Sequence, residues 1–372
     1  MTRPACDVLV VGAGPAGASA ALAAARAGAR VTVVDRRGTI GVPVQCAEYI
    51  PALLLREVPA CAPAVVQRVS AMRTFVRGEP AGDLAAPGCT VDRDRFDRLL
   101  AAAAERAGAR LLTATAALRC DGDGVVLKRR GGGTSVLGPR VVVGADGPRS
   151  TVGRWAGLVN RRRVPAVQAR VRLVQPLDVT EVYLHPDYPA GYAWLFPKQG
   201  MANAGVGFAP VPGGPRPTAA LAAFLATLAR RGRIAGPVAA YQAGWIPVAP
   251  LADSVRGNLL LVGDAAGQTH PITGAGIFNA VTCGAMAGRW AARAALGDDL
   301  SLLRRYDEEW RDLLGGTLAR AAARRRRMEA HWGRFDDIIR SCWVAFEEYH
   351  RPTLPSKAGE GRDEGAGGRH AG

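Results

Sequence analysis

The sequence predicts an α/β fold in which a β-rich domain is inserted into an α/β domain and helices follow towards the C-terminus. The chain has 372 residues, of which 48% are hydrophobic, so it can bury a core and is not disordered throughout. Segments of about 1–60 and 250–298 alternate strand and helix patterns, whereas the segment of about 165–250 is strand-rich with one helix.

The first elements are a strand, a glycine-rich turn, a helix and a second strand. Residues 7–11 are apolar and β-branched, residues 16–27 are Ala-rich, and Gly28 ends the helix as a C-cap residue. The second strand is predicted over residues 31–35. Further helices are expected over residues 93–107, 149–157, 218–230, 274–295 and 300–327. Further strands are expected over residues 69–76, 110–114, 125–129, 140–143, 168–174, 181–184, 192–196, 202–208 and 258–262.

The chain is strongly basic, and nearly all of its positive charge is Arg. The 48 Lys and Arg residues against 32 Asp and Glu residues give a net charge of +16, and Arg supplies 45 of the 48. This charge favours an anionic partner such as a diphosphate or a lipid surface. A nucleic-acid partner is not expected, because no basic stripe carries interleaved aromatic residues.

Other classes of site and segment are not expected either. Seven Cys without a CxxC pair argue against a disulfide scaffold, and five dispersed His without HExxH argue against a metal site. Residues 8–25 are uncharged, but glycines and a proline interrupt them, which indicates a buried strand and helix rather than a signal peptide or membrane span. We therefore expect a cytoplasmic protein with free thiols, and leave contact with a membrane surface open.

The turn after the first strand has the sequence Gly12-Ala13-Gly14-Pro15-Ala16-Gly17. Gly12 allows the tight turn, Gly14 lets the backbone approach a pyrophosphate, and Gly17 lets the helix pack against the strand. Free N–H groups and the helix dipole then hold the phosphates. Asp35, at the end of the second strand, can accept hydrogen bonds from a ribose. Strand, helix and acid together predict a Rossmann-type nucleotide-binding domain.

Two later segments also place small residues and a carboxylate after an apolar strand. One is GADGPRS over residues 144–150, which contains Asp146. The other is LVGDAAG over residues 261–267, which contains Gly263 and Asp264 and is followed by Pro271 and the helix start at 274–277. Such a carboxylate suits contact with a sugar hydroxyl, and the N–H groups of a glycine-rich helix start suit a developing anion. Each segment alone is also compatible with an ordinary turn.

These motifs, in this order, resemble those of FAD-dependent oxidoreductases with the para-hydroxybenzoate hydroxylase-like fold. The resemblance implies that the late GDA segment contacts the ribityl chain and that the following helix faces the flavin pyrimidine ring. Because only one dinucleotide fingerprint is present, the reductant is expected to be NAD(P)H bound transiently or a reduced electron carrier protein. The expected FAD-binding residues are Gly12, Gly14, Pro15, Ala16, Gly17, Asp35, Arg36, Arg93, Asp146, Gly263, Asp264, Pro271, Gly274, Ala275, Gly276 and Ile277.

Two further segments are similar to those of the geranylgeranyl reductase family. The loop PVQCAE at residues 43–48 contains Cys46, and PAGYAWLFP at residues 189–197 fits the family's PxxYxWxFP motif and is followed by ANAGVG at 202–207. The resemblance covers about residues 5–295 and implies reduction of carbon–carbon double bonds of an isoprenoid chain. The chain differs in Ala275, where relatives often carry Gly or Glu, and in the region after residue 300, which does not match.

The pattern of strands and helices, the composition and the resemblance together predict four regions of the chain. Residues 1–68, 92–160 and 250–298 are expected to form a discontinuous FAD-binding domain, and residues 69–91 and 161–249 an interleaved antiparallel β-sheet substrate domain. Residues 299–355 are expected to form a C-terminal helical region, and the Gly-rich, charged residues 356–372 a disordered tail.

The substrate is expected to lie against Tyr192, Trp194 and Phe196, which alternate along a strand and therefore face one side. That side is either the wall of an elongated apolar pocket or ordinary core. Cys46 is the expected catalytic residue, as a proton donor or a polarisable contact to the flavin, and the alternative is a small buried hydrophobe. His270, just before Pro271, is a further candidate for contact with flavin or substrate, although its position favours a structural role.

Double-bond reduction needs hydride from flavin N5 and a proton for the other carbon, in a pocket that excludes water. The main alternative is a flavin monooxygenase that hydroxylates a small molecule or a protein side chain. A halogenase is less compatible, because the WxWxIP segment is replaced by YAWLFP at 192–197. A non-catalytic FAD- or lipid-binding protein also stays open.

The Arg-rich segments have two interpretations each. Arg161–Arg163, with Arg170 and Arg172, either attract a diphosphate or an anionic lipid head or are solvated surface. The helix with Arg324–Arg327 and the aromatic residues after it either rests on a membrane surface or packs on the body of the protein.

Overall fold

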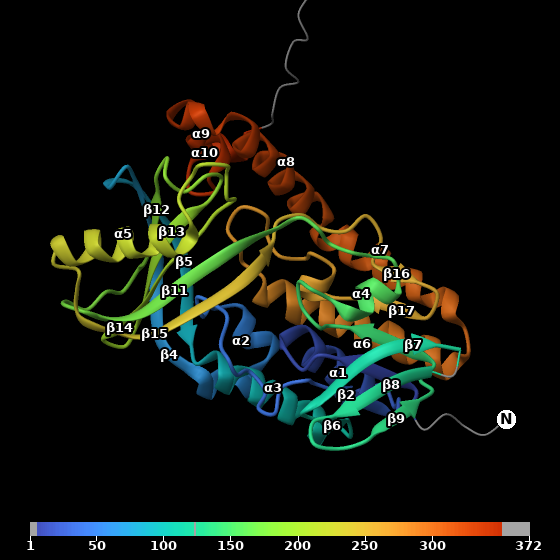
Figure 1. The fold of residues 1–372 in the computed structure, drawn as a ribbon. Helices are drawn as coiled ribbons and strands as arrows, with labels where there is room; N and C mark the ends of the chain where they lie inside the picture. Colours follow the sequence, from blue (N-terminus) through green and yellow to red (C-terminus); the bar gives the residue numbers. More distant parts are fainter. Residues whose placement is uncertain (1–5, 123, 352–372) are drawn as a thin grey trace, which may run out of the picture.

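A six-stranded sheet forms the centre of the part of the molecule at the lower right of Figure 1, with strand order β16-β17-β10-β1-β2-β6. The computed structural model describes residues 6–122 and 124–351. The four inner parallel strands are buried on both faces, as a sheet between two layers requires, whereas the parallel edge strand β6 is partly exposed. They are β1 (Val8–Val11), β2 (Val31–Val34), β6 (Arg110–Leu112), β10 (Val141–Gly144) and β17 (Leu259–Leu261), with the antiparallel β16 (Val255–Arg256) at one edge.

Alternate residues of these strands point to opposite layers. Val8 and Val10 pack with the helices α1 (Pro15–Arg26), α3 (Arg93–Arg106) and α6 (Ile277–Gly297). Leu9 and Val11 face a smaller layer made by a three-stranded sheet and a short helix. Its elements are β7 (Thr115–Asp121), β8 (Gly124–Arg129), β9 (Thr134–Leu137) and α4 (Thr151–Trp155).

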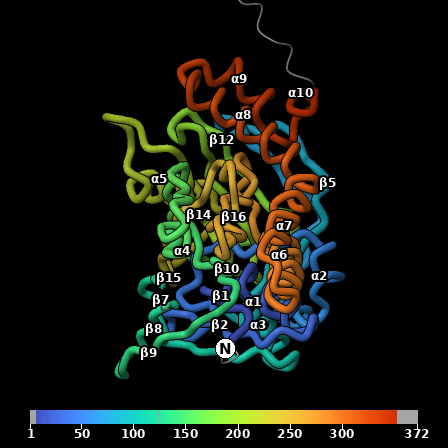
Figure 2. The backbone as a smooth tube through the Cα atoms, turned by 90° about the vertical axis from the view of Figure 1, so that its right-hand side faces the viewer, coloured from blue at the N-terminus to red at the C-terminus, as the bar shows by residue number. Residues whose placement is uncertain are grey.

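Glycines allow α1 and α6 to pack with their backbones in close contact. A Cβ atom on Gly284 would lie 2.4 Å from the carbonyl oxygen of Ala16, and one on Gly288 would lie 2.1 Å from that of Ala20. Both distances are shorter than any real contact of a Cβ atom, so side chains at these positions would push the helices apart. Figure 2 shows α6 running beside α1.

An eight-stranded, mostly antiparallel sheet forms the other half, with order β15-β11-β14-β13-β12-β4-β5-β3. The helix α5 (Pro217–Arg230) covers one of its faces through Leu221, Phe224 and Leu228. The strands are β3 (Tyr49–Pro51), β4 (Val65–Val76), β5 (Glu79–Val91), β11 (Arg163–Leu173), β12 (Thr180–Leu184), β13 (Tyr192–Lys198), β14 (Met201–Gly207) and β15 (Ile234–Pro247). The connection after β3 holds α2 (Leu54–Glu57) and a 3₁₀ helix (Pro59–Ala64).

The C-terminal helices cross from the first half of the molecule to the second (Figures 1 and 2). A 3₁₀ turn (Leu300–Leu302) leads into α7 (Leu303–Trp310), a π-helical turn (Arg311–Gly315) and α8 (Gly316–His331). Another 3₁₀ turn (Trp332–Arg334), α9 (Phe335–Cys342) and α10 (Glu347–His350) complete the described chain.

These helices pack on the body of the protein, as one of the two interpretations of the C-terminal segment predicts, and contact of their outer side with a membrane surface stays a prediction. Trp343 and Phe346 are buried in a cluster with Val182 of β12, and Trp332 donates its indole N–H to the Pro186 carbonyl at 2.7 Å. Arg324 and Arg325, part of the Arg run, are also buried. Within the described residues, no helix is long and apolar enough to cross a membrane.

The predicted fold class is confirmed, and the differences concern element ends and several strands. The strands β5, β7, β9 and β15 were not expected, because their sequences are rich in Ala, Gly or polar residues. Pairing stabilises them: β5 pairs with its neighbour β4, β7 and β9 pair with β8, and β15 pairs with the distant β11. The single helix expected over 300–327 is a series of helical segments. The expected tail, 356–372, lies outside the described residues.

Two predicted helices begin later than expected, for local reasons. The helix expected from residue 149 begins at Thr151, because the Ser150 hydroxyl caps it by accepting the Gly153 N–H at 2.8 Å. The helix expected from residue 274 begins at Ile277, because Gly274 has a φ of 67°, which is outside the helical region.

We expect Gly288→Ala to lower the free energy of unfolding by about 1–3 kcal/mol, the usual cost of overpacking a tight core. Urea denaturation measures the change. The matched control is Gly297→Ala in the same helix, where the new Cβ would meet no described atom within 4 Å. Because Ala favours a helix over Gly by up to about 1 kcal/mol, the control is expected to be neutral or stabilising. Equal stability of the two variants would contradict the packing described.

Candidate active site

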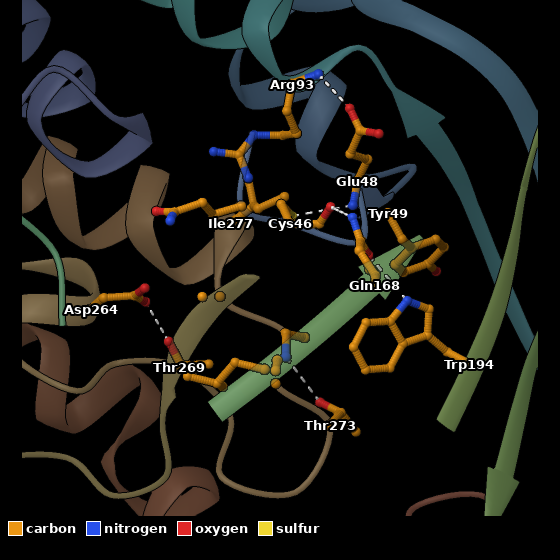
Figure 3. Close-up of a pocket in the computed structure, with 18 of the residues that line it drawn as sticks. Cys46, Glu48, Tyr49, Arg93, Gln168, Trp194, Asp264, Thr269, Thr273 and Ile277 are labelled. Carbon is orange, nitrogen blue, oxygen red and sulfur yellow. Dashed lines mark hydrogen bonds between the residues drawn. The ribbon is translucent and has the colours of Figure 1, made fainter. Parts of the chain in front are cut away.

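A cavity of about 430 Å³ lies between the two halves of the molecule. In Figure 3, Asp264, Thr269 and Ile277 lie on one side of it, and Tyr49 and Trp194 lie on the other. It is lined by the start of α1 (14–16), the loop at 45–49, β11 at 166–168, alternate residues of β13, β15 at 242–246, the segment at 273–277 and Trp343.

The three glycine-containing bends converge at this cavity. A Cβ on Gly12, whose φ is +100°, would lie 2.4 Å from the Ala145 carbonyl oxygen, so the first bend touches the second. A Cβ on Gly263 would lie 2.8 Å from the Cβ of Ala16, so the third bend touches the first. The sequence motifs therefore surround one site, although they are far apart in the chain.

The converging bends fit a dinucleotide with a diphosphate. A Cβ on Gly14 would meet no described atom within 4 Å, which leaves space for a ligand beside the backbone. No side chain of the described residues caps α1 at Gly14 or α6 at Gly276, and both helix starts line the cavity. Their free N–H groups and positive dipole ends favour anionic groups there.

The start of α1 at 14–16 and the start of α6 at 276–277 are called the cradle below. The predicted carboxylates occupy different positions around it. Asp35 accepts the Ala13 N–H at 2.9 Å and the Arg37 N–H at 2.8 Å, while Arg36 is exposed. Asp264 lines the cavity and accepts the Thr269 hydroxyl at 2.6 Å, and burial raises the pKa of its carboxyl group.

Asp146 has a structural partner of its own. Its carboxylate accepts the Ser150 hydroxyl and the Thr151 N–H, both at 2.5 Å, and thereby fixes the second bend to the start of α4. Asp146 does not line the cavity, although its neighbours Ala145 and Gly147 do. A direct contact between Asp146 and the cofactor stays a prediction.

His270 and Pro271 support the cavity rather than line it. The His270 ring accepts the Thr273 N–H at 3.2 Å, and burial lowers the pKa of this imidazole to about 4. Pro271 is buried, and its carbonyl accepts a hydrogen bond from Arg325 at 3.3 Å. The structure therefore places His270 in the turn that carries Thr273 and Gly274, and it shows no exposure of His270 to the cavity.

The structure places Tyr192, Trp194 and Phe196 together on the cavity wall. The Tyr192 hydroxyl donates to the Thr273 carbonyl, and the Trp194 indole N–H donates to Gln168 at 3.3 Å. Because their polar atoms are occupied, the surface that these side chains offer to the cavity is apolar. Their binding of a substrate stays a prediction.

Cys46 borders the cavity and is half-buried, unlike Cys6, Cys61 and the other fully buried cysteines of the described chain. Its sulfur accepts the Glu48 N–H at 3.2 Å, and its carbonyl accepts the Gln168 amide at 2.7 Å.

Arg93 also lines the cavity and lies beside Cys46 (Figure 3). Its guanidinium pairs with Asp97 at 3.1 Å. Burial alone would lower the pKa of Arg93, but the Asp97 carboxylate and the Cys46 side chain raise it above its usual value. Arg93 therefore stays charged at the edge of the cavity.

Glu48 is a buried carboxylate that sequence reasoning missed. Its Oε1 atom accepts Lys198 Nζ at 2.8 Å and the Arg93 backbone N–H at 3.1 Å. Its Oε2 atom accepts the Asn203 amide at 2.8 Å and the Arg170 guanidinium at 3.1 Å. These donors come from α3 and from three strands of the eight-stranded sheet. The signal that could have predicted a buried acidic partner was the presence of Lys198, Asn203 and Arg170 on strands that also carry buried apolar residues.

The Glu48 contacts fix the backbone of the loop that carries Cys46. Glu48 has a φ of 69°, a left-handed conformation that is uncommon for residues other than glycine. Asn203 also donates to the Ala47 carbonyl at 3.2 Å. The Cys46–Glu48 segment is therefore held from the eight-stranded sheet by both side-chain and main-chain hydrogen bonds.

The predicted cluster of Arg161–Arg163, Arg170 and Arg172 does not act as one patch. Arg170 points inward to Glu48. Arg162 pairs with Glu329 of α8 at 2.6 Å. Arg161 is exposed, and Arg163 donates to the Asn160 carbonyl at 2.9 Å.

Comparisons with known proteins agree with this geometry. The profile of the FAD dependent oxidoreductase family matches residues 7–147. A digeranylgeranylglycerophospholipid reductase from Methanothrix thermoacetophila is 35% identical over 339 residues, which are 85% of each chain. Digeranylgeranylglycerophospholipid reductase 1 from Methanopyrus kandleri is 36% identical over 323 residues, which are 82% of this chain and 86% of the relative.

Solved structures show the same similarity. A geranylgeranyl bacteriochlorophyll reductase-like protein from Thermoplasma acidophilum has a TM-score of 0.81 and 28% identity, and the match covers 92% of both chains. Pseudomonas aeruginosa PqsL in complex with 2-aminobenzoylacetate has a TM-score of 0.69 and 22% identity over 90% of this chain and 99% of that chain. The second similarity shows the shared fold alone.

We expect Glu48→Gln to lower the free energy of unfolding by about 3 kcal/mol, because it leaves the buried Lys198 without its full counter-charge. Gln has backbone preferences close to those of Glu, so the change isolates the charge. The control is Asp83→Asn, which breaks the exposed pair with Arg73 and is expected to cost less than about 1 kcal/mol. Chemical denaturation of both variants tests the difference, and a cost of Glu48→Gln no larger than the control would contradict a central role for Glu48.

Proposed function

The chain belongs to the digeranylgeranylglycerophospholipid reductase family of FAD-dependent oxidoreductases, and on this basis we propose that it reduces carbon–carbon double bonds of a geranylgeranyl-type chain carried on a lipid. The observation that supports the proposal most is the meeting of a diphosphate cradle and an aromatic wall in one cavity. The first suits the cofactor and the second suits an apolar chain.

The residues of the cradle suit FAD. The N–H groups at the start of α1 would hold the diphosphate, and Asp35 would accept a ribose hydroxyl. Asp264 and the start of α6 at Ile277 would contact the ribityl chain and the flavin ring. When bound and reduced, FAD supplies hydride to the substrate. NAD(P)H or a reduced electron carrier protein would be the source of the electrons.

The opposite wall would bind the isoprenoid chain and exclude water. Trp194 and Phe196 offer apolar ring surfaces, and Trp343 from the C-terminal helices extends this wall. An isolated alkene has no carbonyl group to polarise, so the enzyme must place the chain and provide a proton to one carbon. The Cys46 thiol is the proposed proton source, with its sulfur held by the Glu48 N–H and placed beside the guanidinium of Arg93.

Anaerobic reoxidation of the reduced flavin tests the proposed function. We expect geranylgeranyl diphosphate, mixed with the reduced holoprotein, to restore the absorbance of oxidised flavin and to yield a more saturated chain. The matched control is phytanyl diphosphate, which has no double bond and is expected to leave the flavin reduced. No reoxidation without oxygen, combined with a hydroxylated product when oxygen is present, would instead establish a monooxygenase.

We expect Cys46→Ala to slow this reoxidation by about 100-fold or more, the usual contribution of a general acid, while FAD binding is unchanged. Cys120→Ala is the control, because Cys120 is also half-buried but lies on β7, away from the cavity. Single-turnover absorbance measurements give the rates. Full turnover of Cys46→Ala would remove Cys46 as the proton source and leave the proposed reaction to a bound water.

A further inference from the structure

Two guanidinium groups lie against one indole at the opening of the cavity. Trp245 of β15 lines the cavity and is 38% exposed, so its ring lies where the cavity meets solvent. The guanidinium carbon of Arg149 is 4.8 Å from the centre of this ring, and that of Arg163 is 5.6 Å from it. Both cations are therefore placed beside the opening by contact with the same side chain.

The two cations come from separate parts of the fold. Arg149 follows Gly147, which lines the cavity in the second bend. Arg163 begins β11, where Pro165 is paired with Trp245. Residues 163 and 165 face the same side of the strand, so Arg163 and Trp245 are diagonal neighbours. Hydrogen bonds from Arg163 to the carbonyls of Asn160 and Pro148, at 2.9 and 3.4 Å, fix its position.

The positive charge at this point is not compensated by the protein. Other Arg residues near the cavity have acidic partners, such as Asp97 for Arg93 and Glu48 for Arg170. Across residues 6–122 and 124–351, neither Arg149 nor Arg163 forms a salt bridge. Two like charges beside one ring repel each other, and an anion bound near them would relieve that repulsion.

We propose that Arg149, Arg163 and Trp245 form a subsite for a phosphate group of a ligand whose remaining atoms enter the cavity. Guanidinium groups bind phosphate oxygens through paired N–H donors and keep their charge at every physiological pH. The indole provides an apolar surface next to them, where the chain of an isoprenoid phosphate would begin.

Two ligands carry this chemistry at such a site. One is the phosphate of an isoprenoid lipid whose chain continues along the wall of Trp194, and this source rests on the proposed function. The other is the diphosphate of a nicotinamide dinucleotide that reduces the flavin. Trp245 is exposed and lines the cavity, so a ligand from solvent would meet it on entry.

Binding to the FAD-loaded full-length chain tests the subsite. Geranylgeranyl diphosphate and geranylgeraniol share the isoprenoid chain and differ in the phosphates, so their dissociation constants are compared by fluorescence titration. We expect the Arg149→Gln/Arg163→Gln double variant to bind the diphosphate about 100-fold more weakly, roughly tenfold for each charged contact, and the alcohol as before. Arg161→Gln is the control, because it removes an exposed neighbouring charge outside the subsite.

A parallel titration with NADPH distinguishes the sources. Loss of NADPH binding in the double variant with unchanged diphosphate lipid binding would support the subsite and assign it to the dinucleotide. The proposal is overturned if neither ligand is affected, if Arg161→Gln weakens binding equally, or if the variant loses only affinity for FAD in the apoprotein. Reoxidation of the wild-type flavin is measured separately, so failure of the proposed reaction is distinguishable from failure of the subsite.

Discussion

The arrangement of the active site depends on the buried carboxylate of Glu48. It collects donors from the start of α3 in one half of the molecule and from Lys198, Arg170 and Asn203 in the other. Lys198 also contacts Asp92 at 2.8 Å, so two acidic and two basic groups balance one another, with Glu48 and Lys198 buried and Asp92 and Arg170 partly exposed. The same contacts that join the halves also position the loop of Cys46, because Glu48 belongs to that loop.

The parts of the site that rest on local requirements could be predicted from the sequence. Gly12 and Gly17 are needed because other backbone atoms lie too close to these positions for any side chain to fit. This requirement is visible in the sequence as the spacing of the glycines in the first motif. The alternation of Tyr192, Trp194 and Phe196 likewise places them on one face of a strand, whatever the strand pairs with. Both expectations led to the cavity that the structure contains.

The parts that rest on distant partners could not be predicted. Glu48 and Asn203 are 155 residues apart, and nothing in either segment alone indicates that they form a hydrogen bond. The strand β15 contains many Ala and Gly residues, so its sequence does not favour a strand, and its pairing with β11, which lies far earlier in the chain, stabilises it. The pairing of Arg170 with Glu48 likewise removed a residue from the expected surface cluster.

Part of the aromatic wall of the cavity, Trp343, comes from the C-terminal segment of the chain. Trp343 contacts the ring of Tyr192 and is tied to β4 by a 3.1 Å hydrogen bond to Thr74, yet it belongs to the C-terminal helices and shares no element with the nucleotide cradle. The glycine bends that suit the cofactor and this part of the cavity wall therefore belong to different segments of the chain. Substitutions in this segment can therefore reshape one wall of the cavity while the glycine bends on the other side stay unchanged.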